Sequence, residues 1–151
     1  AGASLILASD IKVCASHATF LNAFTRVGLV PDSGMTYMLP RVLGASKALE
    51  HMWLAKPITA EQALACGLVN RVVPAERVLA EAAQIAVELA AMPPLAVALT
   101  KQAVNRSLEA LSLDEQMEYE AQLQEILGRT HDHAEGVTAF LEKRPPQFKG
   151  E

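Results

Sequence analysis

Aromatic residues, cysteines and long apolar runs are all scarce in this chain. Phe, Trp and Tyr together make up 5% of the 151 residues, and this shortage beside many alanines and leucines favours helix. No run reaches the ~18 apolar residues of a membrane-spanning helix, so we expect no membrane segment. The two cysteines, Cys14 and Cys66, have no metal-ligand spacing and form no CxxC pair. They indicate free thiols in a reducing compartment, and we expect a cytoplasmic protein.

Basic residues are also fewer than acidic residues in this chain. Lys and Arg total 13 against 17 Asp and Glu, and the net charge of −4 argues against a general attraction to nucleic acid. The four histidines share no common spacing, so we expect no metal site. An apolar content of 51% and a charged content of 20% are typical of a globular chain, and the length allows one domain with a core.

Hydrophobic periodicity divides the chain into a small α/β part and a helical part. Extended segments are expected at 10–15, 19–20, 24–27 and 69–73, where polar and apolar residues alternate or β-branched residues gather. Helices are expected at 2–8, 35–42, 47–55, 60–66, 76–92, 95–111, 113–127 and 132–143, with Thr59 and Ser112 as caps.

Two turns differ from ordinary core sequence. Residues 1–4 (Ala-Gly-Ala-Ser) form a small-residue turn that opens an apolar helix, and Asp32 lies in the turn of residues 28–34 among apolar neighbours. A backbone N–H from the first turn and a carboxylate base from the second are the two parts needed to move a proton next to a carbonyl. The alternatives are that Gly2 only allows tight packing and that Asp32 or Ser33 only shapes its turn or caps the helix beginning near Met35.

Three segments, "GLVPDSGMTYMLPRVLG", "ITAEQALACGLVNRVV" and "GVTAFLEKRPPQF", resemble the crotonase superfamily in their order and spacing, and the likeness covers essentially the whole chain. The resemblance implies an α/β fold, a superhelix of repeated ββα turns followed by a helical trimerisation region. Residues 1–74 would then be the C-terminal part of the crotonase core, and residues 75–151 the helical trimerisation and CoA-contact region. Because the chain begins inside the first turn without a Met, we expect it to be the C-terminal part of a longer protein.

The resemblance also implies an acyl-CoA thioester as substrate, with its oxygen held by two backbone N–H groups. Gly2 matches the glycine that supplies the second of these. Hydratases of the superfamily use two glutamates, at the places held here by Leu5 and Phe24. Because neither residue is acidic, simple hydration is disfavoured.

Asp32 resembles the aspartate of the isomerases of phenylacetate breakdown. We expect Leu5, Phe24 and Leu29 to line the substrate site. Leu29, Val30 and Phe24 are expected to desolvate Asp32 and to raise its pKa toward useful basicity. The implied reaction is a double-bond shift, from Δ3- to Δ2-enoyl-CoA or of the 1,2-epoxyphenylacetyl-CoA type. The alternatives are an aspartate nucleophile acting on an aromatic acyl-CoA and a non-catalytic CoA-binding subunit.

Two residues near the end of the chain match CoA contacts of the superfamily. Phe140 matches an aromatic that lines the acyl or adenine region, and Lys143 matches a lysine that meets CoA phosphates. The alternative for Lys143 is an ordinary helix end, where a cation favours the C-terminal dipole. The resemblance implies a homotrimer or a hexamer and no cofactor beyond the CoA of the substrate. We also expect Met117, Tyr119 and Leu123 to expose apolar surface for such an assembly.

Overall fold

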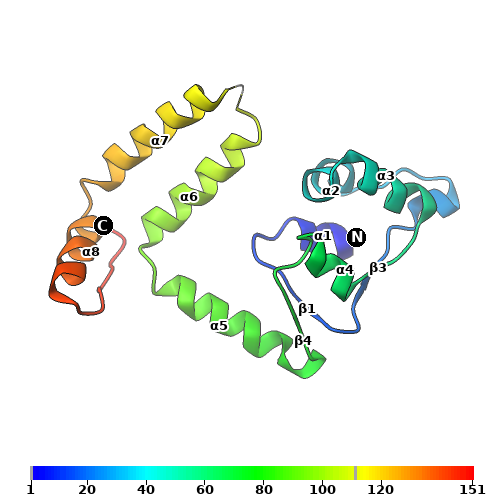
Figure 1. The fold of residues 1–151 in the computed structure, drawn as a ribbon, viewed down its shortest axis with the longest axis horizontal. Coiled ribbons are helices and arrows are strands. Elements are labelled where there is room, and N and C mark those ends of the chain that lie inside the picture. The colour runs from blue at the N-terminus through cyan, green and yellow to red at the C-terminus, as the bar shows by residue number, and fades with distance from the viewer. Residues whose placement is uncertain (1, 111) are drawn as a thin grey trace. The chain divides into compact units, whose positions relative to one another are not determined.

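The computed structural model describes residues 2–110 and 112–151 (Figure 1). Ala1, expected in the first turn, and Leu111, expected at the end of helix 95–111, lie outside the described residues. The chain divides into two compact units, one ending at Gln84 and the other beginning at Ile85. This division falls within a helix rather than after residue 74, and the roles predicted for the two parts stay predictions.

The first unit contains the short elements. Helices lie where they were expected near residues 2–8, 35–42, 47–55 and 60–66, whereas Phe24–Val27 is a turn of 3-10 helix and not an extended segment. The elements in chain order are α1 (Gly2–Leu7), β1 (Val13–Ala15), β2 (Thr19–Phe20), η1 (Phe24–Val27), α2 (Met35–Leu43), α3 (Ala45–Leu54), β3 (Ile58–Thr59), α4 (Ala60–Ala65), β4 (Arg71–Val73) and η2 (Ala75–Arg77).

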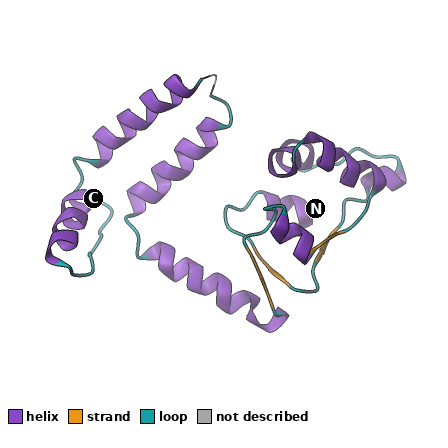
Figure 2. Cartoon of the chain, viewed as in Figure 1, coloured by secondary structure: helices purple, strands orange, loops and turns teal. Residues whose placement is uncertain are grey.

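Two small sheets join distant parts of this unit (Figure 2). Strands β1 and β4 run parallel, with Cys14 opposite Val72. Strands β2 and β3 run antiparallel, with Phe20 opposite Ile58. Each sheet therefore pairs a segment that precedes the Asp32 turn with a segment that follows it.

The core of the first unit lies between its helices and these strands. Small residues allow close approach: Ala48 of α3 is fully buried and Ala60 of α4 is 1% exposed. Burial also raises the pKa of the Cys14 thiol, so this cysteine behaves as a packing residue and not as a nucleophile. The buried cluster comprises Leu7, Cys14, Phe20, Met35, Leu39, Ala48, Met52, Ile58, Ala60, Ala63, Leu68 and Val69.

Helices make up most of the rest: α5 (Val78–Ala90), which crosses the division, then α6 (Pro94–Ser107), α7 (Leu113–Leu127) and α8 (His131–Glu142). Glu81 of α5 pairs with Arg71 of β4, which attaches the start of this helix to the first unit. Within the described ranges no single helix is long and apolar enough to cross a membrane. The stretches 75–90 and 94–107 satisfy that length and composition only together, across a sharp bend.

In the second unit, the expectation that Met117, Tyr119 and Leu123 all expose apolar surface is wrong for Leu123. Met117 is 55% exposed, as expected, but Leu123 is only 8% exposed and lies in the groove between α6 and α7. Tyr119 is half-buried, and the guanidinium of Arg106 stacks 4.2 Å from its ring centroid. The antiparallel pairing of α6 with α7 covers Leu123, which the pattern within α7 alone does not reveal.

Carboxylates of α8 hold the C-terminal residues in what we call the C-terminal clasp, formed by Asp132, Glu135 and residues 144–151. Asp132 is 3% exposed, and its two oxygens accept hydrogen bonds from the backbone N–H groups of Lys149 (2.7 Å) and Gly150 (2.8 Å). Glu135 binds the Arg144 guanidinium in a bidentate pair (2.6 and 2.8 Å). Hydrogen bonds from the tail to these two acidic side chains thus hold the tail against α8.

Acid is expected to weaken this clasp through Glu135. Hydrogen bonds from Arg144 and from the Gln147 N–H lower the pKa of Glu135 from its ordinary 4.5 to about 2. Because the folded pKa lies below the unfolded one, the stability that Glu135 contributes is present above the unfolded pKa and is lost as the pH falls through about 2. We expect the melting temperature to fall more steeply between about pH 5 and pH 2 than it does in Glu135→Gln. Circular dichroism would measure both profiles, and parallel profiles would contradict the prediction.

Candidate functional site

The Asp32 turn connects η1 to α2 through a run of unusual backbone angles. Gly28 ends η1 with φ 72°, and Ser33 and Gly34 follow Asp32 with φ 54° and 78°, all in the left-handed region. Gly34 is the N-cap of α2 and no side chain caps that helix, so the expectation that Asp32 or Ser33 caps it is wrong. Two successive left-handed residues turn the chain before the helix begins, which leaves the Asp32 carboxylate outside the capping position.

Helix α1 lies against this turn through Ser4. The Ser4 side chain is 2% exposed, and its Oγ donates to the Asp32 carbonyl oxygen at 3.4 Å. Leu5, by contrast, is 73% exposed. Ser4 is therefore a buried residue of α1 that touches the Asp32 turn. The sequence could have indicated it, since Ser4 and Leu7 are three apart and share the buried face of the helix.

Gly2 begins α1 at an exposed position. No described atom outside its own neighbourhood lies within 4 Å of the place where a Cβ would stand. Tight packing within the described residues is thus not the reason for glycine here. The role predicted for its N–H stays a prediction.

The carboxylate of Asp32 is exposed, and Ser33 Oγ donates to its Oδ1 at 2.9 Å. Leu29 is 59% and Val30 74% exposed, while Phe24 is half-buried. The expected desolvation of Asp32 by these apolar side chains is therefore wrong for this chain. They project from the turn instead of covering the carboxylate.

A small cavity lies beside the same turn, with Ala3 of α1 and Met35 of α2 in its wall. Asn22 also lines it and is 7% exposed, yet neither its Nδ2 nor its Oδ1 has a hydrogen-bond partner among the described residues. A cavity of about 20 Å³ has room for roughly one water molecule and not for an acyl group. An unpaired buried polar group typically costs about 1–3 kcal/mol of folding free energy, so the unpaired Asn22 amide destabilises the fold beside the turn.

The two predicted CoA contacts lie on the second unit. Phe140 is 82% exposed on α8, and Lys143 is the exposed C-cap of that helix, with φ 55°. Arg144, directly after it, is bonded to Glu135 and Glu142. The clasp therefore fixes the backbone next to Lys143 and leaves the lysine itself at the surface.

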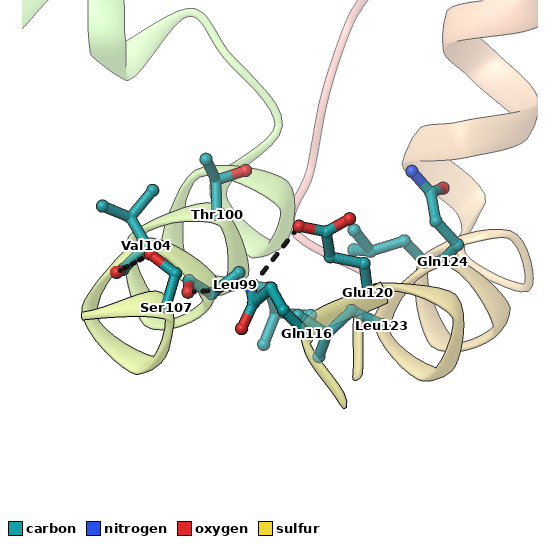
Figure 3. Close-up of a pocket in the computed structure, with 10 residues that line it drawn as sticks. Leu99, Thr100, Val104, Ser107, Gln116, Glu120, Leu123 and Gln124 are labelled. Atoms are coloured by element: carbon teal, nitrogen blue, oxygen red, sulfur yellow. Dashed lines mark hydrogen bonds between the residues drawn. The ribbon is translucent and has the colours of Figure 1, made fainter. Parts of the chain in front are cut away.

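The second unit also contains two apolar grooves. One lies between α6 and α7 and has a volume of about 290 Å³ (Figure 3). In its wall, Gln116 Nε2 of α7 donates to the Ala103 carbonyl oxygen of α6 at 3.2 Å and to Glu120 Oε1 of its own helix at 3.4 Å. The other is about 580 Å³ and lies between α6, the end of α7, α8 and the tail, with Phe140 and Phe148 in its wall. Phe140 thus lines a groove large enough for part of an organic ligand.

The sequence resembles known proteins over its whole length. The family model described as enoyl-CoA hydratase/isomerase matches residues 1–151. The 1,2-epoxyphenylacetyl-CoA isomerase of Escherichia coli K12 is 44% identical over 150 residues, covering 99% of this chain and 57% of that protein. The 2,3-dehydroadipyl-CoA hydratase of the same organism is 39% identical over 150 residues, covering 99% and 58%. An enoyl-CoA hydratase structure from Bacillus anthracis matches with a TM-score of 0.94 and 35% identity, covering 99% of this chain and 58% of that one. The chain thus spans less than two thirds of the length of these relatives.

Proposed function

The chain belongs to the enoyl-CoA hydratase/isomerase family, and we propose that the protein it forms is an acyl-CoA isomerase that shifts a double bond with Asp32 as its acid/base. The α/β crotonase fold that the sequence resembles is confirmed by the similarity to solved structures. The substrate would be a Δ3-enoyl-CoA or a thioester of the 1,2-epoxyphenylacetyl-CoA type. The relative named as such an isomerase shares 44% identity, and the hydratase named above shares 39%.

One observation carries the proposal: Asp32 is held beside the start of α1, and the described residues place no second carboxylate on that helix. Helix α1 has no acidic residue in its first turn, and Ser4 joins this helix to the Asp32 backbone. By the family resemblance, Leu5 and Phe24 match the places of the two glutamates of hydratases. A hydratase needs one group to activate water and another to protonate the neighbouring carbon. A single base is sufficient when the same proton leaves one carbon and returns to another.

In the proposed reaction, Asp32 removes a proton from C2 of the thioester. The C2–H bond breaks, an O–H bond forms on the carboxylate, and the electron pair moves toward the thioester oxygen. The N–H of Gly2 would be one of two donors that stabilise this oxygen, and loss of one such donor typically costs about 3–4 kcal/mol of barrier. The protonated Asp32 then returns the proton to C4, which leaves the double bond between C2 and C3.

Asp32 is exposed in this chain, so the rest of such a site must supply side chains that shield its carboxylate from water. A carboxylate in water is a weak base, and cover over Leu29 and Val30 would exclude water from it. We propose that the whole protein provides this cover and contacts CoA through Phe140 and Lys143. We further propose that it is a homotrimer or hexamer located in the cytoplasm. Apolar side chains available for assembly include Leu113 (72% exposed) and Leu141 (73% exposed).

Turnover on matched 3-enoyl-CoA and 2-enoyl-CoA substrates tests the proposal. We expect the 3-enoyl thioester to become the conjugated 2-enoyl thioester, followed by ultraviolet absorbance, and no water to be added to either substrate, followed by mass spectrometry. Hydration of the 2-enoyl thioester would contradict the proposal and favour a hydratase. A protein that binds CoA thioesters without any turnover would instead favour a non-catalytic CoA-binding subunit.

A further inference from the structure

We infer that Ser33 is a positioning residue that orients the Asp32 carboxylate, an inference that rests on the proposed function. Ser33 has φ 54°, in the left-handed region that residues with a Cβ rarely adopt. Glycine is the residue that adopts this conformation without a steric penalty, and the next residue, Gly34 (φ 78°), is one. Something other than backbone geometry therefore explains a serine at this position.

The hydroxyl is the one group that serine offers and glycine lacks. Ser33 is exposed, so it contributes no core packing. Its Oγ donates to Asp32 Oδ1 at 2.9 Å, an ordinary distance for a hydrogen bond to an ionised carboxylate. The Ser33 hydroxyl, at a position of strained backbone, thus donates a hydrogen bond to the carboxylate to which we assign the proton transfer.

The backbone of Asp32 is fixed separately from its side chain. Its carbonyl oxygen accepts from Ser4 Oγ at 3.4 Å and from the Met35 N–H at 3.0 Å. These contacts hold the main chain between α1 and α2, whereas Ser33 restrains rotation of the carboxylate itself. Since Ser33 binds Oδ1, and no described residue binds Oδ2, Oδ2 is the oxygen left to exchange the proton.

Among the described residues, no charged or titratable side chain of the neighbouring elements donates to the Asp32 carboxylate. Helix α1 carries no titratable side chain. The titratable groups on α2 are Tyr37 and Arg41, and Arg41 stacks 3.4 Å from the Tyr37 ring centroid and donates to the Tyr37 carbonyl. On η1, Arg26 donates to the Ala55 carbonyl. None of these contacts involves Ser33, so a loss of kcat in a Ser33 variant would report the lost hydroxyl.

The test compares Ser33→Gly, Ser33→Ala and Ser33→Asn in the whole protein. Glycine removes the hydroxyl and suits the left-handed backbone, alanine removes the hydroxyl alone, and asparagine keeps a donor and tolerates this backbone. We expect both Ser33→Gly and Ser33→Ala to lower kcat about 10-fold while KM stays within about twofold, because the thioester still binds but the carboxylate is less well oriented. Ser33→Asn should restore part of kcat.

A Ser33→Gly protein with unchanged kcat would overturn the inference, because the shape of the turn would then be the only requirement at this position. A fall in kcat for Ser33→Ala alone would also overturn it, since only backbone strain separates these two variants. Asp32→Asn distinguishes this failure from failure of the proposed function. If Asp32→Asn is inactive while Ser33→Gly is normal, only the role of Ser33 is wrong; if Asp32→Asn is fully active, the proposed function is wrong.

Discussion

Asp32→Asn is expected to lower isomerase turnover by about 10²–10⁴-fold, the usual contribution of a positioned acid/base, while KM changes little. The amide has nearly the size of the carboxylate, and the Ser4 and Met35 contacts go to the backbone of residue 32, so the turn should keep its shape. The amide, however, cannot accept the C2 proton at neutral pH. The measurement is kcat and KM on a 3-enoyl-CoA, with thioester binding followed by calorimetry.

Asp10→Asn is the matched control for this experiment. Asp10 is also an exposed aspartate of the first unit, and it lies outside the Asp32 turn. The same substitution there should leave turnover within about twofold, because surface changes of this kind usually have small effects. Unchanged turnover in Asp32→Asn would refute the acid/base role. A covalent acyl or aryl adduct on Asp32, found by mass spectrometry, would instead favour the nucleophilic alternative.

Asp132→Ala is expected to destabilise the C-terminal clasp by about 3 kcal/mol, because it leaves the backbone N–H groups of two tail residues without their charged acceptor. These donors belong to Lys149 and Gly150, and the carboxylate that serves them is 3% exposed. Asp132→Asn keeps one carbonyl acceptor and should lose about half as much. Urea denaturation gives the free energy of unfolding, and digestion by a carboxypeptidase reports release of the tail directly.

Asp114→Ala separates the clasp from a general helix effect. Asp114 is the second residue of α7, as Asp132 is the second residue of α8, so both carboxylates interact with the N-terminal end of a helix dipole. Asp114 is exposed and should cost about 0.5–1 kcal/mol when removed. Equal losses at the two positions would show that the dipole, and not the tail, accounts for the stability that Asp132 provides.

The sequence predicts the segments that form this site, whereas the packing of α1 decides which of its side chains contact the turn. The residue types alone indicate that Asp32 and the start of α1 belong to one site, and the Ser4 hydrogen bond joins them. Leu5 matches a position of the family pattern and is 73% exposed, and its predicted role stays a prediction; Ser4 is buried and contacts the turn. Residue type and spacing identify these two segments. The packing of α1 decides which of its side chains point inward.

Local sequence alone determined the helices of the second unit, the Thr59 capping box and the family to which the chain belongs. These depend on residues a few positions apart, whose periodicity and capping chemistry are written in the chain. Tertiary structure decided the rest: the left-handed pair after Asp32 starts α2 without a side-chain cap, α6 covers Leu123, and Leu29 is left exposed. Burial and side-chain orientation depend on segments that are distant in sequence, because a side chain is desolvated only by atoms that the fold brings against it.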